Sequence, residues 1–174
     1  MRRAISVLGG VLVFVAVFWW IANRRAQANT GGARERLIGT WELVSTEDRM
    51  SDGSKQPFQD FGPHAKGYLM YAADGHMSAQ LMNPDRAKWK DEKKPTPEEK
   101  AKAFEGFAAY AGRFEVDEEK QIVYHLPDVA LSADLLGTRQ ARPYFFDGDL
   151  LTFSGKMEGV PGVESYSITW RKVK

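Results

Sequence analysis

The clearest pattern of hydrophobic positions lies in residues 67–82, where two runs of apolar, aromatic and small residues flank Asp74 and Gly75. An Asp-Gly pair between such runs predicts a β-hairpin with a type I′ turn, because that turn needs positive φ at both central residues. Hairpin side chains alternate between two faces, so Leu69 and Tyr71 share one of them. Neither face is cleanly polar, which favours a sheet that packs on one side and lines a cavity on the other.

Shorter alternating segments follow the same pattern through the rest of the chain. They predict six further strands, at residues 37–45, 113–117, 121–126, 137–146, 150–154 and 165–173. In the first of these, Trp41, Leu43 and Ser45 share a face. Because helices do not alternate with these strands, all eight are expected in one antiparallel sheet. Closing the sheet into an eight-stranded barrel removes its exposed edges and leaves room for side chains or one small ligand.

One helix is predicted between the hairpin and the later strands. Thr96 suits the N-cap, Pro97 suits the first helical position, and Glu99 completes a capping box. Apolar residues then recur at helical spacing, at Phe104, Phe107, Ala108 and Ala111. The predicted helix, residues 97–111, therefore has an apolar face that needs an end or a side of the sheet as its partner.

The N-terminal pattern differs, because an apolar run of 19 residues, 4–22, lies between Arg2-Arg3 and Arg24-Arg25. A run of this length nearly spans a bilayer core and predicts a hydrophobic helix. The small residues at 26–28 also fit a signal-peptidase site, so an uncleaved transmembrane anchor and a cleaved signal peptide are both open. Residues 1–28 are assigned to this membrane anchor or signal peptide, residues 29–36 to a linker and residues 37–174 to the barrel. The protein is therefore expected either to be anchored in a membrane or to be exported to the periplasm or extracellular space.

Composition narrows the chemistry. The chain has no Cys, which excludes thiol nucleophiles, thiolate metal sites and disulfides. Its three His residues (His64, His76 and His125) lack zinc-like spacing, so no metal or other cofactor is expected. Residues 37–174 hold 18 basic and 22 acidic residues. A nucleic-acid partner is not expected, because it would require a clustered basic excess.

Several short motifs occur along the chain in an order and spacing that point to a known family. They are LIGTWEL (37–43), GYLMY (67–71), DGHMSAQ (74–80), YAG (110–112), VD (116–117), His125, GTRQ (137–140) with Arg142, GDLLT (148–152) and WR (170–171). Together they resemble the bacterial and fungal lipocalin-like domain over residues 37–174. The resemblance implies a small barrel with a pocket. Gly39-x-Trp41 is also similar to the opening motif of lipocalins, in which a late Arg stacks on the Trp, and Arg171 would take that structural role.

Polar residues at strand spacing supply the candidate pocket. Gln140 and Arg142 share a face of the predicted strand at 137–146, and the opposite face, which includes Arg139 and Pro143, makes no better core. The family pattern therefore places Gln140 and Arg142 inside the barrel. There the Arg142 guanidinium would bind a carboxylate or another anionic oxygen.

Four other residues complete the predicted ligand-binding set. His125 shares a face with Val123 in a mostly apolar strand, which fits either a hydrogen-bonded core residue or an acid–base group. Ser78 and Gln80 share a face of the hairpin, where they either line the pocket or make structural hydrogen bonds. Tyr71 is expected in the core or at the rim.

Three functions are compatible with these observations. The first is a membrane-tethered or exported barrel that binds a small, largely apolar molecule with a polar or acidic end. The second is an isomerase, cyclase or hydrolase in which His125 moves a proton and Arg142 stabilises negative charge. The third is a non-catalytic interaction module that docks a protein through the helix at 97–111, which an exposed apolar helix face would favour.

Overall fold

The computed structural model describes residues 32–174, and the chain divides into two compact units, Met1–Arg36 and Leu37–Lys174. The predicted anchor or signal peptide at 1–28 lies outside the described residues. None of the helices within 32–174 has the length and apolar character needed to cross a membrane. The elements are α2 (Ala33–Leu37), β1 (Gly39–Met50), β2 (Lys55–Gln56), β3 (Lys66–Tyr71), β4 (His76–Met82), α3 (Pro97–Glu105), β5 (Phe107–Asp117), β6 (Ile122–Ala130), η1 (Ala133–Leu135), β7 (Gln140–Asp147), β8 (Leu150–Lys156) and β9 (Val163–Lys172).

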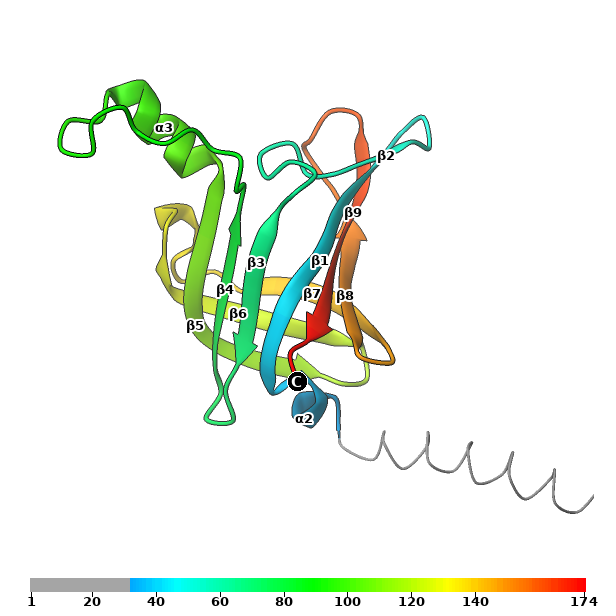
Figure 1. Cartoon of the computed structure of the whole chain (residues 1–174). Coiled ribbons are helices and arrows are strands. Elements are labelled where there is room, and N and C mark those ends of the chain that lie inside the picture. The colour runs from blue at the N-terminus through cyan, green and yellow to red at the C-terminus, as the bar shows by residue number, and fades with distance from the viewer. Residues whose placement is uncertain (1–31) are drawn as a thin grey trace, which may run out of the picture. The chain divides into compact units, whose positions relative to one another are not determined.

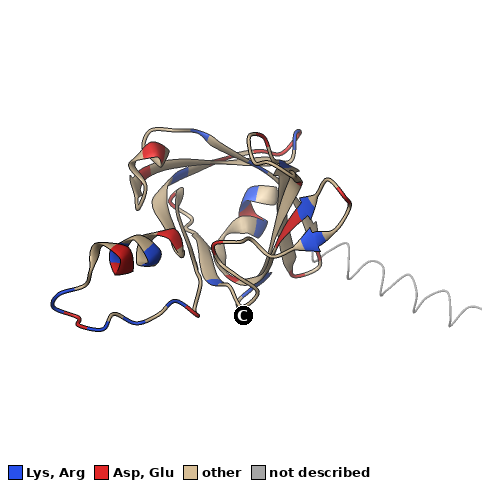
Figure 2. Ribbon diagram, turned by 90° about the horizontal axis from the view of Figure 1, so that it is seen from above, with Lys and Arg blue, Asp and Glu red and all other residues tan. Residues whose placement is uncertain are grey.

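Eight antiparallel strands close into a barrel in the order β1-β3-β4-β5-β6-β7-β8-β9, and β9 pairs back with β1 (Figure 1). The two residues of β2 add a short extra strand beside the end of β1. The predicted eight-stranded antiparallel barrel with one inserted helix is confirmed. Seen from above in Figure 2, the strands form a ring, and many charged residues lie on α3 and on the loops.

The β3–β4 hairpin forms where the sequence predicted it, but the predicted type I′ turn is wrong. Gly75 has φ +96°, whereas Asp74 keeps negative φ. The Gly75 N–H donates to the Ala72 carbonyl (3.1 Å), and the Ala72 N–H donates to the carbonyl of His76 (2.8 Å). The turn is therefore one residue longer than expected, and only its last position requires glycine.

A β-bulge in β1 changes which side chains face the barrel interior. The pairing with β9 shifts between Leu43 and Ser45, so that Leu43 lies opposite Trp170 and Thr46 lies opposite Ile168. Thr46 is buried and Ser45 is exposed. The prediction that Trp41, Leu43 and Ser45 share a face is corrected, because the bulge inserts one residue into the alternation. It also turns Asp48 inward.

The predicted helix at 97–111 is too long, since α3 ends at Glu105. Its N-terminus is as predicted: Thr96 Oγ1 accepts from the Glu99 N–H (3.2 Å), and Glu99 Oε2 accepts from the Thr96 N–H (2.8 Å). Residues 107–111 instead pair along β4 as the start of β5. Sheet hydrogen bonds formed with a distant segment outweigh the local helical spacing.

Candidate functional site

The lower end of the barrel is filled by large side chains, which we call the floor. Trp41, Leu69, Leu151 and Trp170 are each 2% exposed or less. The Trp41 indole N–H donates to the Leu37 carbonyl (2.7 Å). Close packing at this end confines any ligand to the part of the interior above the floor.

The residue that covers Trp41 is not the predicted one. Arg171 is exposed and pairs in register with Glu42 on the outer face of the barrel. Lys172 lies opposite Trp41, and its Nζ is 4.9 Å from the Trp41 ring centroid. The assignment of Arg171 is corrected to Lys172, because a shift of one residue along a strand exchanges the two faces. Gly39 has φ +125°, which accounts for glycine in the motif.

Above the floor, polar side chains from several strands meet at His125, which is 1% exposed. Tyr71 Oη lies 2.5 Å from His125 Nε2, and Tyr110 Oη lies 2.8 Å from Nδ1. Burial, with a smaller effect of the Arg142 charge, lowers the pKa of His125 to about 3. The imidazole is therefore neutral near pH 7 and carries one proton.

Arg142 lies on β7 next to this group and points into the barrel. Burial acts to lower the pKa of its guanidinium, but hydrogen bonds and charge interactions with Tyr110 and Tyr166 outweigh it and raise that pKa. Arg142 Nη2 also lies 3.4 Å from Gln140 Oε1. No carboxylate within residues 32–174 forms an ion pair with Arg142. We call Tyr71, Tyr110, His125, Arg142 and Tyr166 the polar belt.

Tyr166 reaches the polar belt across a glycine. Gly155 on β8 pairs with Tyr166 on β9, and a Cβ at Gly155 would lie 3.0 Å from Tyr166 Cε1 and 3.2 Å from its hydroxyl. The absence of a side chain at Gly155 lets the Tyr166 ring lie over β8 toward β7, where Arg142 is located.

The closed barrel, its filled floor and the polar belt fit one type of protein. A family model described as the lipocalin-like domain matches residues 38–173. The chain belongs to this lipocalin-like family. A search of curated proteins finds no match to the chain. The lipocalin-like fold generally binds small hydrophobic molecules inside its barrel.

In this lipocalin-like barrel, Ser78 and Gln80 do not lie where the sequence suggested. Their neighbours Met77, Ala79 and Leu81 are buried and pair with the inward side chains of β3. Ser78 and Gln80 therefore occupy the outer face of β4, where Gln80 Nε2 donates to Ser78 Oγ (2.6 Å). The prediction that they line the pocket is corrected, because the larger apolar side chains of β4 take the inner face.

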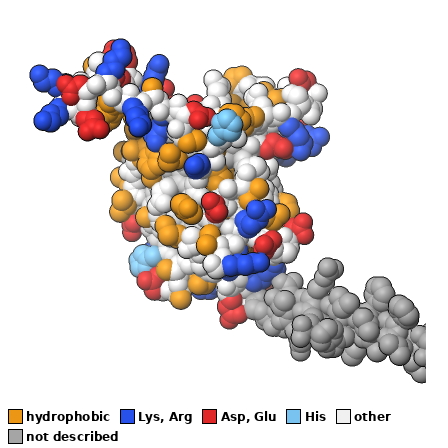
Figure 3. All heavy atoms as spheres, in the orientation of Figure 1, with side chains coloured by type: hydrophobic (Ala, Val, Ile, Leu, Met, Phe, Trp, Pro, Cys, Tyr) orange, Lys and Arg blue, Asp and Glu red, His pale blue; other side chains and the backbone are white. Residues whose placement is uncertain are grey.

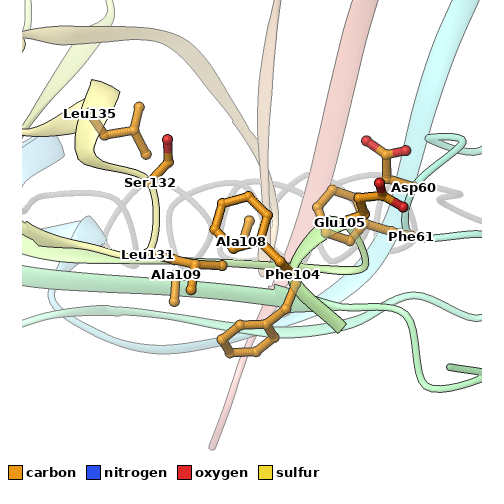
Figure 4. Close-up of a pocket in the computed structure, with 10 residues that line it drawn as sticks. Asp60, Phe61, Phe104, Glu105, Ala108, Ala109, Leu131, Ser132 and Leu135 are labelled. Carbon is orange, nitrogen blue, oxygen red and sulfur yellow. The ribbon is translucent and has the colours of Figure 1, made fainter. Parts of the chain in front are cut away.

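The upper end of the barrel carries an apolar cavity of about 320 Å³. We call its main apolar residues the mouth: Phe61, Phe104, Phe107, Ala108, Leu131 and Leu135. They come from the loop after β2, from the end of α3, from β5 and from the segment around η1, and Asp60 and Glu105 lie on the side away from Leu135 (Figure 4). Apolar side chains also gather on the surface near α3 in the space-filling view (Figure 3).

The mouth borders the barrel interior. Ala108 pairs with inward-facing Leu81 and lines the mouth cavity. The loop that carries Phe61 is attached to β1 through Phe58, whose N–H donates to the inward hydroxyl of Thr46 (3.3 Å). Below it, the inward-facing Arg142, Tyr110 and Tyr166 all keep accessible surface, unlike the floor.

Sequence reasoning missed Tyr110, Tyr166 and Asp48 as site residues. Tyr166 alternates with Ile168 and Trp170, so the alternation itself could have placed it inside. Tyr110 lay in the segment assigned to the helix, and Asp48 lay beyond the strand predicted at 37–45, whereas β1 continues to Met50. Within residues 32–174, no three His, Asp or Glu side chains are arranged to hold a metal ion.

Proposed function

We propose that this barrel binds a small, largely apolar molecule with an acidic end, which it holds at Arg142. The observation that carries the proposal is the guanidinium itself. It lies inside the barrel, and its partners are two tyrosines, Gln140 and the Ala141 carbonyl instead of a carboxylate. A cation removed from bulk water without a counter-charge is costly, so an anionic ligand group would offset that cost.

The apolar part of the ligand would extend from the polar belt toward the mouth. Phe61, Ala108 and Leu131 supply apolar surface there, and the floor closes the other direction. This combination of an apolar lining with a few convergent polar groups is typical of small-molecule sites. Phe104, the one large apolar residue of α3, belongs to the same cavity, so we assign the exposed helix face to ligand entry and not to a protein partner.

The catalytic alternative gains no support from the geometry around His125. Both ring nitrogens are engaged by tyrosine hydroxyls, and the ring is almost fully buried. A general base must reach the proton that it removes. We therefore assign His125 to positioning within the polar belt.

Binding of a dansyl-labelled fatty acid to the full-length chain tests the proposal. We expect saturable fluorescence enhancement with one site per chain. Arg142→Met should weaken binding about tenfold or more, because a charge-assisted hydrogen bond to the carboxylate is lost. Arg139→Met is the matched control. Arg139 belongs to the same segment but points outward, where it stacks on Tyr124 and pairs with Glu115. An absence of saturable binding, or equal affinity of the Arg142→Met variant, would refute the proposal.

We further propose that residues 1–28 tether the barrel to a membrane or direct its export. The apolar run at 4–22 and its flanking arginines support this. The test is the intact mass of the protein recovered from the membrane and soluble fractions of its host. A full-length mass in membranes would establish an anchor, and a soluble mass beginning near residue 29 would establish export. A full-length soluble protein would contradict both.

A further inference from the structure

The hydrogen-bond partners of His125 determine which way the proton of a neighbouring tyrosine points. We propose that Tyr71 locks His125 in the Nδ1–H tautomer, so that the Tyr110 hydroxyl donates its proton to a ligand carboxylate held by Arg142. The inference rests on the proposed function. It identifies the ligand group as a carboxylate and Tyr110 as the second hydrogen-bond donor to it, beside Arg142. Tyr71 and His125 act in it as positioning residues, and Tyr110 as a binding residue.

The argument begins at Tyr71, which is 2% exposed and packs edge-on against Phe114, with ring centroids 4.7 Å apart. Within the described part of the chain, His125 Nε2 is the one hydrogen-bond partner of the Tyr71 hydroxyl. If Nε2 carried the imidazole proton, the Tyr71 oxygen would accept a hydrogen bond from Nε2–H. The buried O–H of Tyr71 would then lack an acceptor. An unsatisfied buried donor is costly, so the Tyr71 hydroxyl donates and Nε2 accepts.

The proton of the neutral ring must then be on Nδ1. Nδ1–H donates to the Tyr110 oxygen over 2.8 Å. The same oxygen interacts with the Arg142 guanidinium, which can only donate. The Tyr110 oxygen is thus an acceptor in both interactions, and its own proton is left for another acceptor.

Tyr110 is the accessible member of this hydrogen-bonded group. Tyr110 keeps accessible surface, whereas Tyr71 and His125 do not. On the other side of Arg142, the Tyr166 hydroxyl lies over Gly155. Three strands, β5, β7 and β9, therefore direct donors toward one position. A carboxylate, with two oxygens and negative charge, fits this set better than an alcohol or an ester, which cannot use all of these donors.

The tautomer can be measured without any ligand. Long-range ¹H–¹⁵N correlation spectra of the full-length chain, labelled at histidine, distinguish Nδ1–H from Nε2–H by the nitrogen shifts. We expect the Nδ1–H form for His125, with His125→Gln assigning the signals. An Nε2–H tautomer would overturn the inference and leave the proposed function standing.

Ligand binding supplies the second test, with dodecanoate and dodecanol as a pair that differs in the end group. Tyr110→Phe should reduce dodecanoate affinity about tenfold and change dodecanol affinity by less than about twofold. Tyr71→Phe should also reduce the affinity for dodecanoate, by about threefold or more, although Tyr71 is shielded from the ligand. Tyr124→Phe, on the outer face of β6, is the control and should leave both affinities unchanged.

The double variant Tyr71→Phe/Tyr110→Phe should bind dodecanoate no more weakly than Tyr110→Phe alone, because both substitutions remove the same donated proton. Additive losses, or an unchanged affinity in Tyr71→Phe with its His125 tautomer retained, would refute the positioning role. If neither dodecanoate nor dodecanol binds the wild-type chain, the proposed function fails instead.

Discussion

The polar belt and the mouth lie in one barrel but are built on opposite principles. In the polar belt, His125 and Tyr71 are buried and hydrogen-bonded to each other, and His125 also bonds to Tyr110, which keeps accessible surface. In the mouth, Phe104 is 50% exposed and Leu131 is 41% exposed, with few polar partners. A network fixed by hydrogen bonds discriminates between chemical groups, whereas an apolar rim accepts many shapes. We therefore expect the belt to select the ligand's end group and the mouth to set how strongly its chain is held.

The largest expected effect comes from acidifying the polar belt. The pKa of His125 falls from 6.5 to about 3 on folding, so the folded state binds fewer protons than the unfolded state between these values. Stability from this group is complete above pH 6.5 and is lost as the pH falls toward 3. The full loss is on the order of 5 kcal/mol.

Urea unfolding of the wild-type chain at a series of pH values from 7 to 4 measures most of this loss. His125→Phe should flatten the pH dependence, although it lowers stability at pH 7 by leaving two tyrosine hydroxyls without their partner. Phe145→Ala, at a half-exposed and non-titrating position on the outer face of β7, is the control and should keep the wild-type slope. An unchanged slope in the His125→Phe variant would show that this residue does not titrate as described.

A smaller effect is expected at Gly155, which keeps the Tyr166 ring in place. Gly155→Ala brings a Cβ to 3.0 Å from Tyr166 Cε1 and must displace that ring. We expect dodecanoate affinity to fall about fivefold, and the free energy of unfolding to fall by about 1 kcal/mol. Tyr166→Phe removes only the hydroxyl and should reproduce the loss of affinity without the loss of stability. Retained affinity in both variants would exclude Tyr166 from the ligand site.

The mouth should respond differently to substitution. Phe61→Ala removes apolar surface from the cavity. It should weaken the binding of dodecanoate and of dodecanol by the same factor, about threefold. Phe145, which is 50% exposed on the outer face of β7, provides the control Phe145→Ala, for which no change is expected. Equilibrium titration of both ligands measures the factors. Unequal losses would show that Phe61 also senses the end group, and the contrast between the two regions would not hold.

The sequence predicted the barrel and one of its interior faces, but it did not predict which face of the hairpin is inside. Alternation predicted the barrel and placed Gln140 and Arg142 on one face, and these two residues do face the interior. Alternation alone did not say which face of the hairpin is inside, because both faces carry apolar residues. In the structure, Met77 and Leu81 take the interior, and Ser78 is left outside.

The rest depended on contacts between distant segments. Tyr71 on β3 meets His125 on β6 only because the barrel closes, and no local spacing encodes that meeting. The end of α3 was misplaced because the residues after Gly106 are equally compatible with helix and strand until β4 pairs with them. Asp48 lay beyond the strand predicted at 37–45, and the bulge in β1 turns it inward. Single-residue shifts of this kind are set by long-range pairing.

Asp48 offers the smallest and most specific test of the contrast between the belt and the mouth. It faces inward opposite Tyr166, and its Oδ1 has no hydrogen-bond partner within residues 32–174. Burial raises its pKa above 3.8, so the folded state resists its ionisation as the pH rises through this range. Stability from this group is therefore lost with increasing pH, the opposite sign to His125.

In its ionised form, Asp48 would repel an anion bound at the polar belt. Asp48→Asn should raise dodecanoate affinity roughly twofold to threefold, the range expected for a solvent-screened charge. Dodecanol affinity should not change, and the gain for dodecanoate should shrink at high salt. Asp128→Asn, at an exposed position on β6, controls for net charge. A gain of equal size in that control, or for dodecanol, would mean that the effect does not arise from a negative charge beside the polar belt.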